Sequence, residues 1–192
     1  TIKLWDVISG EDIATLAGHG AEVNGLSFSP DGTKLASAGR DGTARVWDTK
    51  NLIELTALPG RSRWLTSVAF NNDGSRLAVA AYDAIQIWDA NSWKETMTLS
   101  GHTEVITSLG FTGDGSRLAS ASHDQTIKVW DIQGGHEMTT LELPNDRIHS
   151  VVFTPDSGRL LSAGTDRTIK IWDARSAHEV RVLSTGEKRP AR

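Results

Sequence analysis

Serine, histidine and aspartate occur twice in this chain at one fixed spacing. The two sets are His19, Ser37 and Asp41, and His102, Ser120 and Asp124. In serine hydrolases these three residue types form a triad in which the serine attacks a carbonyl carbon, the histidine takes its proton and the aspartate orients the histidine. Whether they do such chemistry here depends on the elements that hold them.

The elements are set by a repeat of about 42 residues. Tryptophans stand at positions 5, 47, 88, 130 and 172, with separations of 42, 41, 42 and 42 residues. Phe28, Phe70, Phe111 and Phe153 follow the same period. A period this regular is typical of repeat architectures, in which each unit is one supersecondary element stacked on the next.

The clearest unit runs from Gly101-His102 to Trp130-Asp131. It contains an apolar run, an Asp-Gly turn, a second run, a second tight turn and a third run. This order predicts three strands joined by two hairpins. A fourth, outer strand over 138–143 follows a Gly-Gly turn.

Five Trp-Asp pairs at this spacing, with Gly-His before them, resemble the WD-repeat (Trp-Asp repeat) β-propeller family over nearly all of residues 1–184. The resemblance implies an all-β fold of four-stranded antiparallel blades. Because Trp5 has no turn aspartate before it, the chain begins inside a blade. We therefore expect an open arc of about four and a half blades, a piece of a longer propeller that in this family most often has seven. The expected parts are a half blade over 1–17, blades over 18–58, 59–100 (degenerate), 101–143 and 144–184, and a mobile basic tail over 185–192.

The resemblance also assigns the polar residues. In this family histidine, serine or threonine, aspartate and tryptophan form a buried hydrogen-bonded set. The matching positions are His19, Ser37, Asp41 and Trp47; His102, Ser120, Asp124 and Trp130; and Ser162, Asp166 and Trp172. Each donor in such a set finds an acceptor, since an indole N–H can only donate. The set occurs twice in full, includes a tryptophan and places its serine in a packed strand, so we predict no catalytic residue.

Two blades depart from the pattern. In the second, Pro59-Gly60-Arg61 replaces Gly-His and Val79 replaces the serine, which leaves only Asp83 and Trp88. In the fourth, Pro144 occupies the histidine position. We expect packing, more than this hydrogen-bonded set, to hold both blades.

A partner is expected on the face that carries the loops between successive blades, which in this family most often docks peptides and proteins. The candidate residues are Glu22, Asn24, Arg40, Trp64, Tyr82, His123, Arg147 and His149. Trp64 and Tyr82 stand out because large aromatic residues often anchor interfaces. The alternative is that Trp64 fills the space left by the missing histidine.

Composition excludes several classes of function. A net charge of −4 gives no electrostatic case for nucleic acid. The absence of cysteine rules out disulfides and a thiolate zinc site, and fits a reducing compartment such as the cytoplasm. No apolar run approaches a membrane span. The remaining histidines show no metal spacing, so we expect neither metal nor cofactor.

These observations predict a non-catalytic scaffold for protein–protein interaction. A second hypothesis is a regulatory or targeting appendage of a larger signalling enzyme, such as a kinase or protease, whose catalytic domain lies outside this chain. A third, a propeller lactonase or hydrolase, lacks the clustered carboxylates or metal site it would need. The open ends of the arc should expose apolar surface and strand edges, which favours self-association.

Overall fold

The computed structural model describes residues 1–184, which form five antiparallel sheets. A half blade consists of β1 (Ile2–Trp5) and β2 (Asp12–Leu16). The first and second blades are β3 (Val23–Phe28), β4 (Lys34–Gly39), β5 (Thr43–Asp48) and β6 (Ile53–Pro59), then β7 (Leu65–Phe70), β8 (Arg76–Ala81), β9 (Ala84–Asp89) and β10 (Glu95–Ser100). The third and fourth are β11 (Ile106–Phe111), β12 (Arg117–Ser122), β13 (Thr126–Asp131) and β14 (His136–Glu142), then β15 (Ile148–Phe153), β16 (Arg159–Gly164), β17 (Thr168–Asp173) and β18 (Glu179–Ser184).

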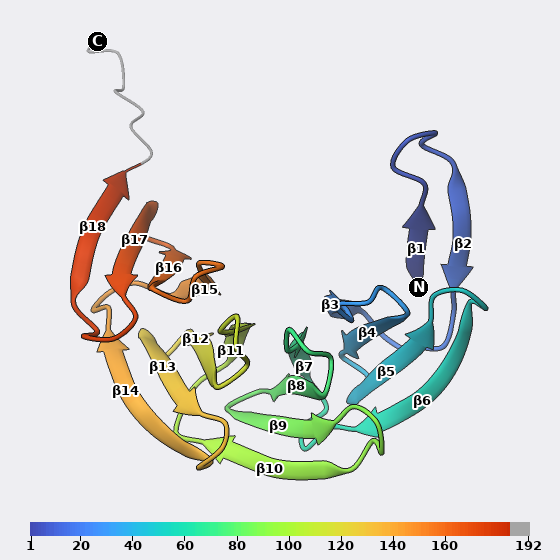
Figure 1. Ribbon diagram of the computed structural model, residues 1–192, viewed down its shortest axis with the longest axis horizontal. Coiled ribbons are helices and arrows are strands. Elements are labelled where there is room, and N and C mark those ends of the chain that lie inside the picture. Colours follow the sequence, from blue (N-terminus) through green and yellow to red (C-terminus); the bar gives the residue numbers. More distant parts are fainter. Residues whose placement is uncertain (185–192) are drawn as a thin grey trace.

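Each blade is a meander whose strands pair in chain order. Tight turns make this possible, since glycines at the first hairpin of three blades adopt positive φ (Gly32 69°, Gly74 71°, Gly115 68°) at little steric cost. The blades form an open arc, with β3, β7, β11 and β15 on the inner side and β6, β10 and β14 on the outer side (Figure 1). The predicted all-β, open propeller arc is confirmed.

A register shift recurs in every sheet where the strand that carries the tryptophan pairs with the outer strand. It lies beside the tryptophan every time, for example between Leu4 and Trp5, between Val46 and Trp47, and between Val129 and Trp130. Such a bulge increases the local twist of the sheet. Every repeat therefore has the same bulge beside its tryptophan as well as the same order of strands.

The hydrophobic core lies between the blades, in layers. Val68 and Phe70 of the second blade pack with Ala36 and Ala38 of the first, and all four are buried. Similar layers join the second blade to the third and the third to the fourth. Small residues on one face and large residues on the other allow neighbouring sheets to interdigitate.

The ends of the arc lack this cover. Phe28 is 55% exposed and Leu26 is 53% exposed, whereas Phe70 is 8% exposed in the next blade. At the other end, Ile169 of the fourth blade is 37% exposed, whereas its counterpart Ile127 is fully buried. The expected exposure of apolar side chains at both ends is therefore present. The expected basic tail over 185–192 lies outside the described residues.

Candidate functional site

The third blade contains a chain of buried hydrogen bonds. The Nδ1 atom of His102 lies 2.7 Å from an Asp124 carboxylate oxygen, and its Nε2 atom lies 2.7 Å from Ser120 Oγ. Trp130 Nε1 donates to the same Oγ over 2.8 Å. Because a carboxylate only accepts, Nδ1 carries the proton and Nε2 accepts from the serine. Burial alone would raise the pKa of Asp124, but hydrogen bonds from His102 and Thr126 hold it well below its usual range.

The first blade repeats this arrangement. His19 Nδ1 lies 2.9 Å from Asp41, His19 Nε2 lies 2.7 Å from Ser37 Oγ, and Trp47 Nε1 donates to Ser37 over 2.9 Å. Asp41 also accepts from the backbone N–H of Gly20 over 2.8 Å. The carboxylate therefore ties the loop that enters the blade to the turn between its second and third strands.

These sets are not arranged for nucleophilic attack. Ser37 and Ser120 are 0% exposed, and each hydroxyl oxygen already accepts an indole N–H. A nucleophile must reach the reacting carbon of a substrate. The arrangement links strands within a blade, and neither serine is placed for hydrolase chemistry.

The second blade replaces this set with another one. Gln86, which is 1% exposed, accepts from the backbone N–H of Arg61 over 3.0 Å and donates to Glu95 over 2.9 Å. Arg61 also pairs with Glu95 through its side chain over 2.8 Å. The indole nitrogen of Trp88 is buried without a hydrogen-bond partner. The expected loss of the family's hydrogen-bonded set is therefore observed, and Gln86, Arg61 and Glu95 supply polar contacts that were not expected.

The fourth blade also has its own substitute. Trp172 Nε1 donates to Ser162 over 3.0 Å, but Asp166 lies outside that pair and bonds to Lys170. Buried Asp146 accepts from Lys170 Nζ over 3.1 Å, which places an ion pair where the first and third blades have histidine. The predicted serine, aspartate and tryptophan set is therefore split in two.

Sequence reasoning overlooked a cross-strand pair that the period itself displays. A basic or amide residue in the third strand pairs with an acidic residue nine positions later in the outer strand. The pairs are Lys3–Asp12 (3.3 Å), Arg45–Glu54 (2.6 Å), Gln86–Glu95 (2.9 Å) and Lys128–Glu137 (2.8 Å). Their recurrence every 41 or 42 residues was a sufficient signal.

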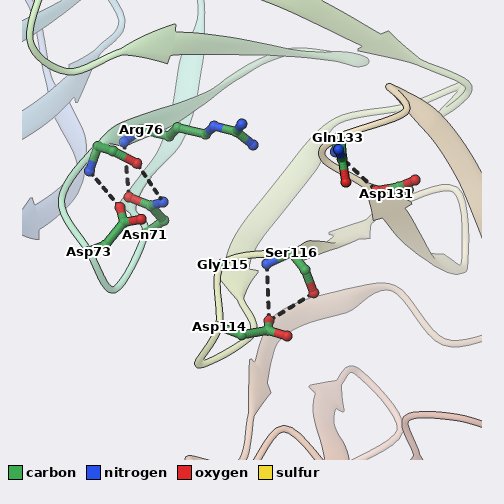
Figure 2. A pocket seen from close by; sticks show the side chains of 9 residues that line it. Asn71, Asp73, Arg76, Asp114, Gly115, Ser116, Asp131 and Gln133 are labelled. Atoms are coloured by element: carbon green, nitrogen blue, oxygen red, sulfur yellow. Dashed lines mark hydrogen bonds between the residues drawn. The ribbon is translucent and has the colours of Figure 1, made fainter.

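A polar cleft of about 300 Å³ lies between the second and third blades, at the ends opposite the inter-blade loops. Figure 2 shows that its carboxylates turn back onto their own hairpins. Asp73 accepts from the Ser75 N–H over 2.8 Å, and Asp114 accepts from the Ser116 N–H over 3.0 Å. Hydrogen bonds from Thr112 and Ser116 lower the pKa of Asp114 to about 2. These aspartates cap turns, and residues 1–184 contain no group of three or more metal-ligating side chains.

The loop face brings three of the predicted partner-binding residues together. Arg40 lies between Glu22, whose carboxylate is 2.5 Å from its guanidinium, and Trp64, whose ring centroid is 4.6 Å away. Trp64 is 39% exposed and Tyr82 is 40% exposed. Trp64 stacks on Arg40 of the first blade.

The other candidates on this face have different surroundings. The amide of Asn24 donates to the carbonyl of Leu65 over 2.8 Å, so it joins the first and second blades. Thr66 and Thr107 occupy the same position in the next two blades and donate to the carbonyls of Ile106 and Ile148.

The two histidines on this face lie farther along the arc. His149 is the fourth-blade counterpart of Asn24, and its ring lies 5.8 Å from that of His123 in an edge-on contact. Burial, together with the charges of His149 and Arg147, lowers the pKa of His123. These three side chains therefore form a group separate from Arg40 and Trp64.

The comparison with protein families agrees with this geometry. The family model described as "WD domain, G-beta repeat" matches residues 10–48, 53–89, 93–131 and 135–173, which is most of the chain. The chain belongs to the WD-repeat family. Each match ends at the aspartate that follows a blade tryptophan, so the WD repeat spans the outer strand of one blade and the first three strands of the next.

Similar proteins share short stretches with these WD repeats. Lissencephaly-1 homolog 1 of Paramecium tetraurelia is 49% identical over 45 residues, which is 23% of this chain and 11% of that protein. Coronin-7 of Homo sapiens is 41% identical over 46 residues, which is 24% of this chain and 5% of that protein. The solved structure of U3-55K superposes with a TM-score of 0.81 at 26% identity, covering 88% of this chain and 54% of that one. The chain thus spans about half of that structure and a small part of the curated relatives. Residues 1–184 contain no helix that could cross a membrane.

Proposed function

We propose that this WD-repeat arc is a non-catalytic scaffold for protein–protein interaction, and that its partner contacts the loop face through Trp64, Tyr82 and Arg40. The observation that carries the proposal is the half-exposed Trp64, stacked on Arg40 beside Glu22. Tryptophan, tyrosine and arginine supply much of the binding energy at interfaces. The ion pair with Glu22 also holds the guanidinium in place before a partner arrives.

The strand framework supports the proposal. Adjacent blades share buried layers, and backbone carbonyls accept side-chain hydrogen bonds across the blade boundaries. Loops mounted on such a framework lose little conformational entropy on binding. The role thus requires no movement of the fold.

The test compares proteins captured from lysate by the wild-type chain and by a Trp64→Ala, Tyr82→Ala double variant. We expect partners of the wild type to be lost from the double variant. Met138→Ala is the control, because Met138 is 47% exposed in the outer strand of the third blade, away from the loop face. Identical capture by the wild type and the double variant would exclude this face.

Three further points belong to the proposal. The chain acts in the cytoplasm, for which its lack of cysteine is suitable. Its exposed ends make a second copy a candidate partner, and light scattering on a sizing column tests this. The second candidate function, a regulatory or targeting appendage of a larger signalling enzyme, uses the same loop face; the sequence of the parent protein tests it.

A further inference from the structure

The hairpin turn between β8 and β9 differs from its counterparts in the other blades. β8 and β9 stay paired as far as Ala81 and Ala84, so Tyr82 and Asp83 alone form the turn. In each of the other blades the last paired residues of the equivalent strands enclose five residues, which are 39–43 in the first blade. The second blade lies between two complete blades (Figure 1), so the surroundings of this turn do not depend on either end of the chain.

The short turn places Tyr82 in an unfavourable backbone conformation. Its φ is 62°, whereas in the other three turns the residue with positive φ follows the turn aspartate (Gly42, Gln125 and Arg167). The first residue of a two-residue hairpin turn has positive φ in the common turn types, which is why glycine, asparagine and aspartate are usual there. A bulky residue in this region is rare and strained, because its Cβ crowds the backbone. Tyrosine therefore stands where glycine would fold more easily.

The side chain of Tyr82 adds little to the fold. It is 40% exposed and packs on none of the apolar core layers of residues 1–184. Its phenol O–H has no hydrogen-bond partner among those residues. The bond that joins the turn to the third blade, from the Ile106 N–H to the Tyr82 carbonyl over 2.7 Å, uses only the backbone. Glycine could make the same bond, so stability does not account for the tyrosine ring.

We infer that Tyr82 determines specificity at the loop face, at the expense of stability: its phenol O–H donates to a backbone carbonyl of an extended peptide segment of the partner, and its ring packs against a side chain of that segment. The inference rests on the loop-face interface proposed above. Strained residues occur mainly at functional sites, where the strain serves binding or catalysis. An extended segment fits the exposed donor, because its backbone carbonyls are not used in internal hydrogen bonds as those of a helix are.

Urea unfolding tests whether Tyr82 destabilises the chain. Tyr82→Gly should raise the urea midpoint by about 0.5 M, because glycine adopts positive φ without strain. Tyr82→Phe should leave the midpoint unchanged, since phenylalanine keeps the ring and the strain and loses only an unpaired O–H. His123→Gly is the matched control: His123 holds the same position in the third blade without positive φ, so glycine should lower the midpoint there. An unchanged or lower midpoint for Tyr82→Gly would overturn the inference.

The probe for recognition is a phage-displayed library of random short peptides, selected on the 192-residue chain. Selected sequences are synthesised with a fluorescein label, and their affinity is measured by fluorescence anisotropy. Tyr82→Phe should weaken binding about three- to tenfold, because one hydrogen bond is lost. Tyr82→Gly should weaken it at least about tenfold, because the ring is lost as well. Met138→Ala, in an outer strand, is the control and should bind as the wild type does.

The outcomes separate this inference from the proposed function. If Trp64→Ala weakens the selected peptides but the Tyr82 variants do not, the inference is wrong and the loop-face interface stands. Equal affinity of the wild type and Tyr82→Phe also refutes it, because the phenol then donates no hydrogen bond to the segment. A library that yields no binder refutes the inference, and the capture experiment then decides the proposed function alone.

Discussion

Replacing Ser120 with alanine tests the energetic role of the buried hydrogen bonds. Its hydroxyl accepts from Trp130 over 2.8 Å and lies 2.7 Å from His102 Nε2, and all three side chains are buried. Each buried polar group left without a partner costs about 1–3 kcal/mol. Ser120→Ala leaves two such groups, so the free energy of unfolding should fall by about 2–6 kcal/mol.

The fourth blade offers a matched control. Ser162 is also buried and accepts from Trp172 over 3.0 Å, but its blade has no histidine at the equivalent position. Ser162→Ala leaves one group unpaired and should cost about 1–3 kcal/mol. The difference between the two variants, about 1–3 kcal/mol, is the contribution of the histidine contact.

Equilibrium urea unfolding measures both losses, and hydrogen exchange in β12 and β16 assigns each loss to its blade. Hydrogen exchange in each blade is needed because repeat arrays can unfold in parts. When Trp130→Phe is already present, Ser120→Ala leaves only His102 without its partner, so its cost should be about 1–3 kcal/mol lower. Equal losses for Ser120→Ala and Ser162→Ala, or full additivity with Trp130→Phe, would refute the reasoning.

Three other predictions concern blade chemistry. Val79→Ser should be less destabilising than Val79→Ala by about 1–2 kcal/mol in urea unfolding, because the new hydroxyl can accept from the unpartnered Trp88 Nε1. Lys170→Met should cost about 2–3 kcal/mol by leaving the Asp146 charge buried, whereas Lys128→Met, whose partner Glu137 is more exposed, should cost at most about 1 kcal/mol. The turn aspartates have folded pKa values below their unfolded value of about 3.9. Their contribution to stability is therefore complete above pH 4 or so, and urea midpoints measured from pH 5 downward should fall as pH drops toward about 2.

Most of the fold was predictable because the same order of apolar runs and turns recurs in every repeat. The positions of Trp47, Trp130 and Trp172, together with Asp-Gly turns, define strands and hairpins by local rules. The two complete hydrogen-bonded sets were predictable for the same reason. Contacts that are not part of the repeat motif were not predicted. The contact of Gln86 with the Arg61 N–H and the Asp146–Lys170 pair depend on how far long side chains reach, and this follows from register and burial, which a motif does not specify.

The second blade, which lacks the histidine of the repeat, also carries Trp64 of the proposed interface in the loop that enters it. In the first and third blades the turn aspartate accepts from the entering loop, Asp41 from Gly20 N–H and Asp124 from Thr103 N–H. Asp83 makes no such bond to the loop over 60–64 within the described residues. Instead, the Arg61 N–H of that loop donates to Gln86. Losing the histidine therefore releases the loop tip from the turn, and Trp64 can lie over Arg40 with part of its ring exposed. The proposed interface therefore draws on the blade that departs most from the repeat, because its loop is attached at Arg61 and leaves Trp64 partly exposed.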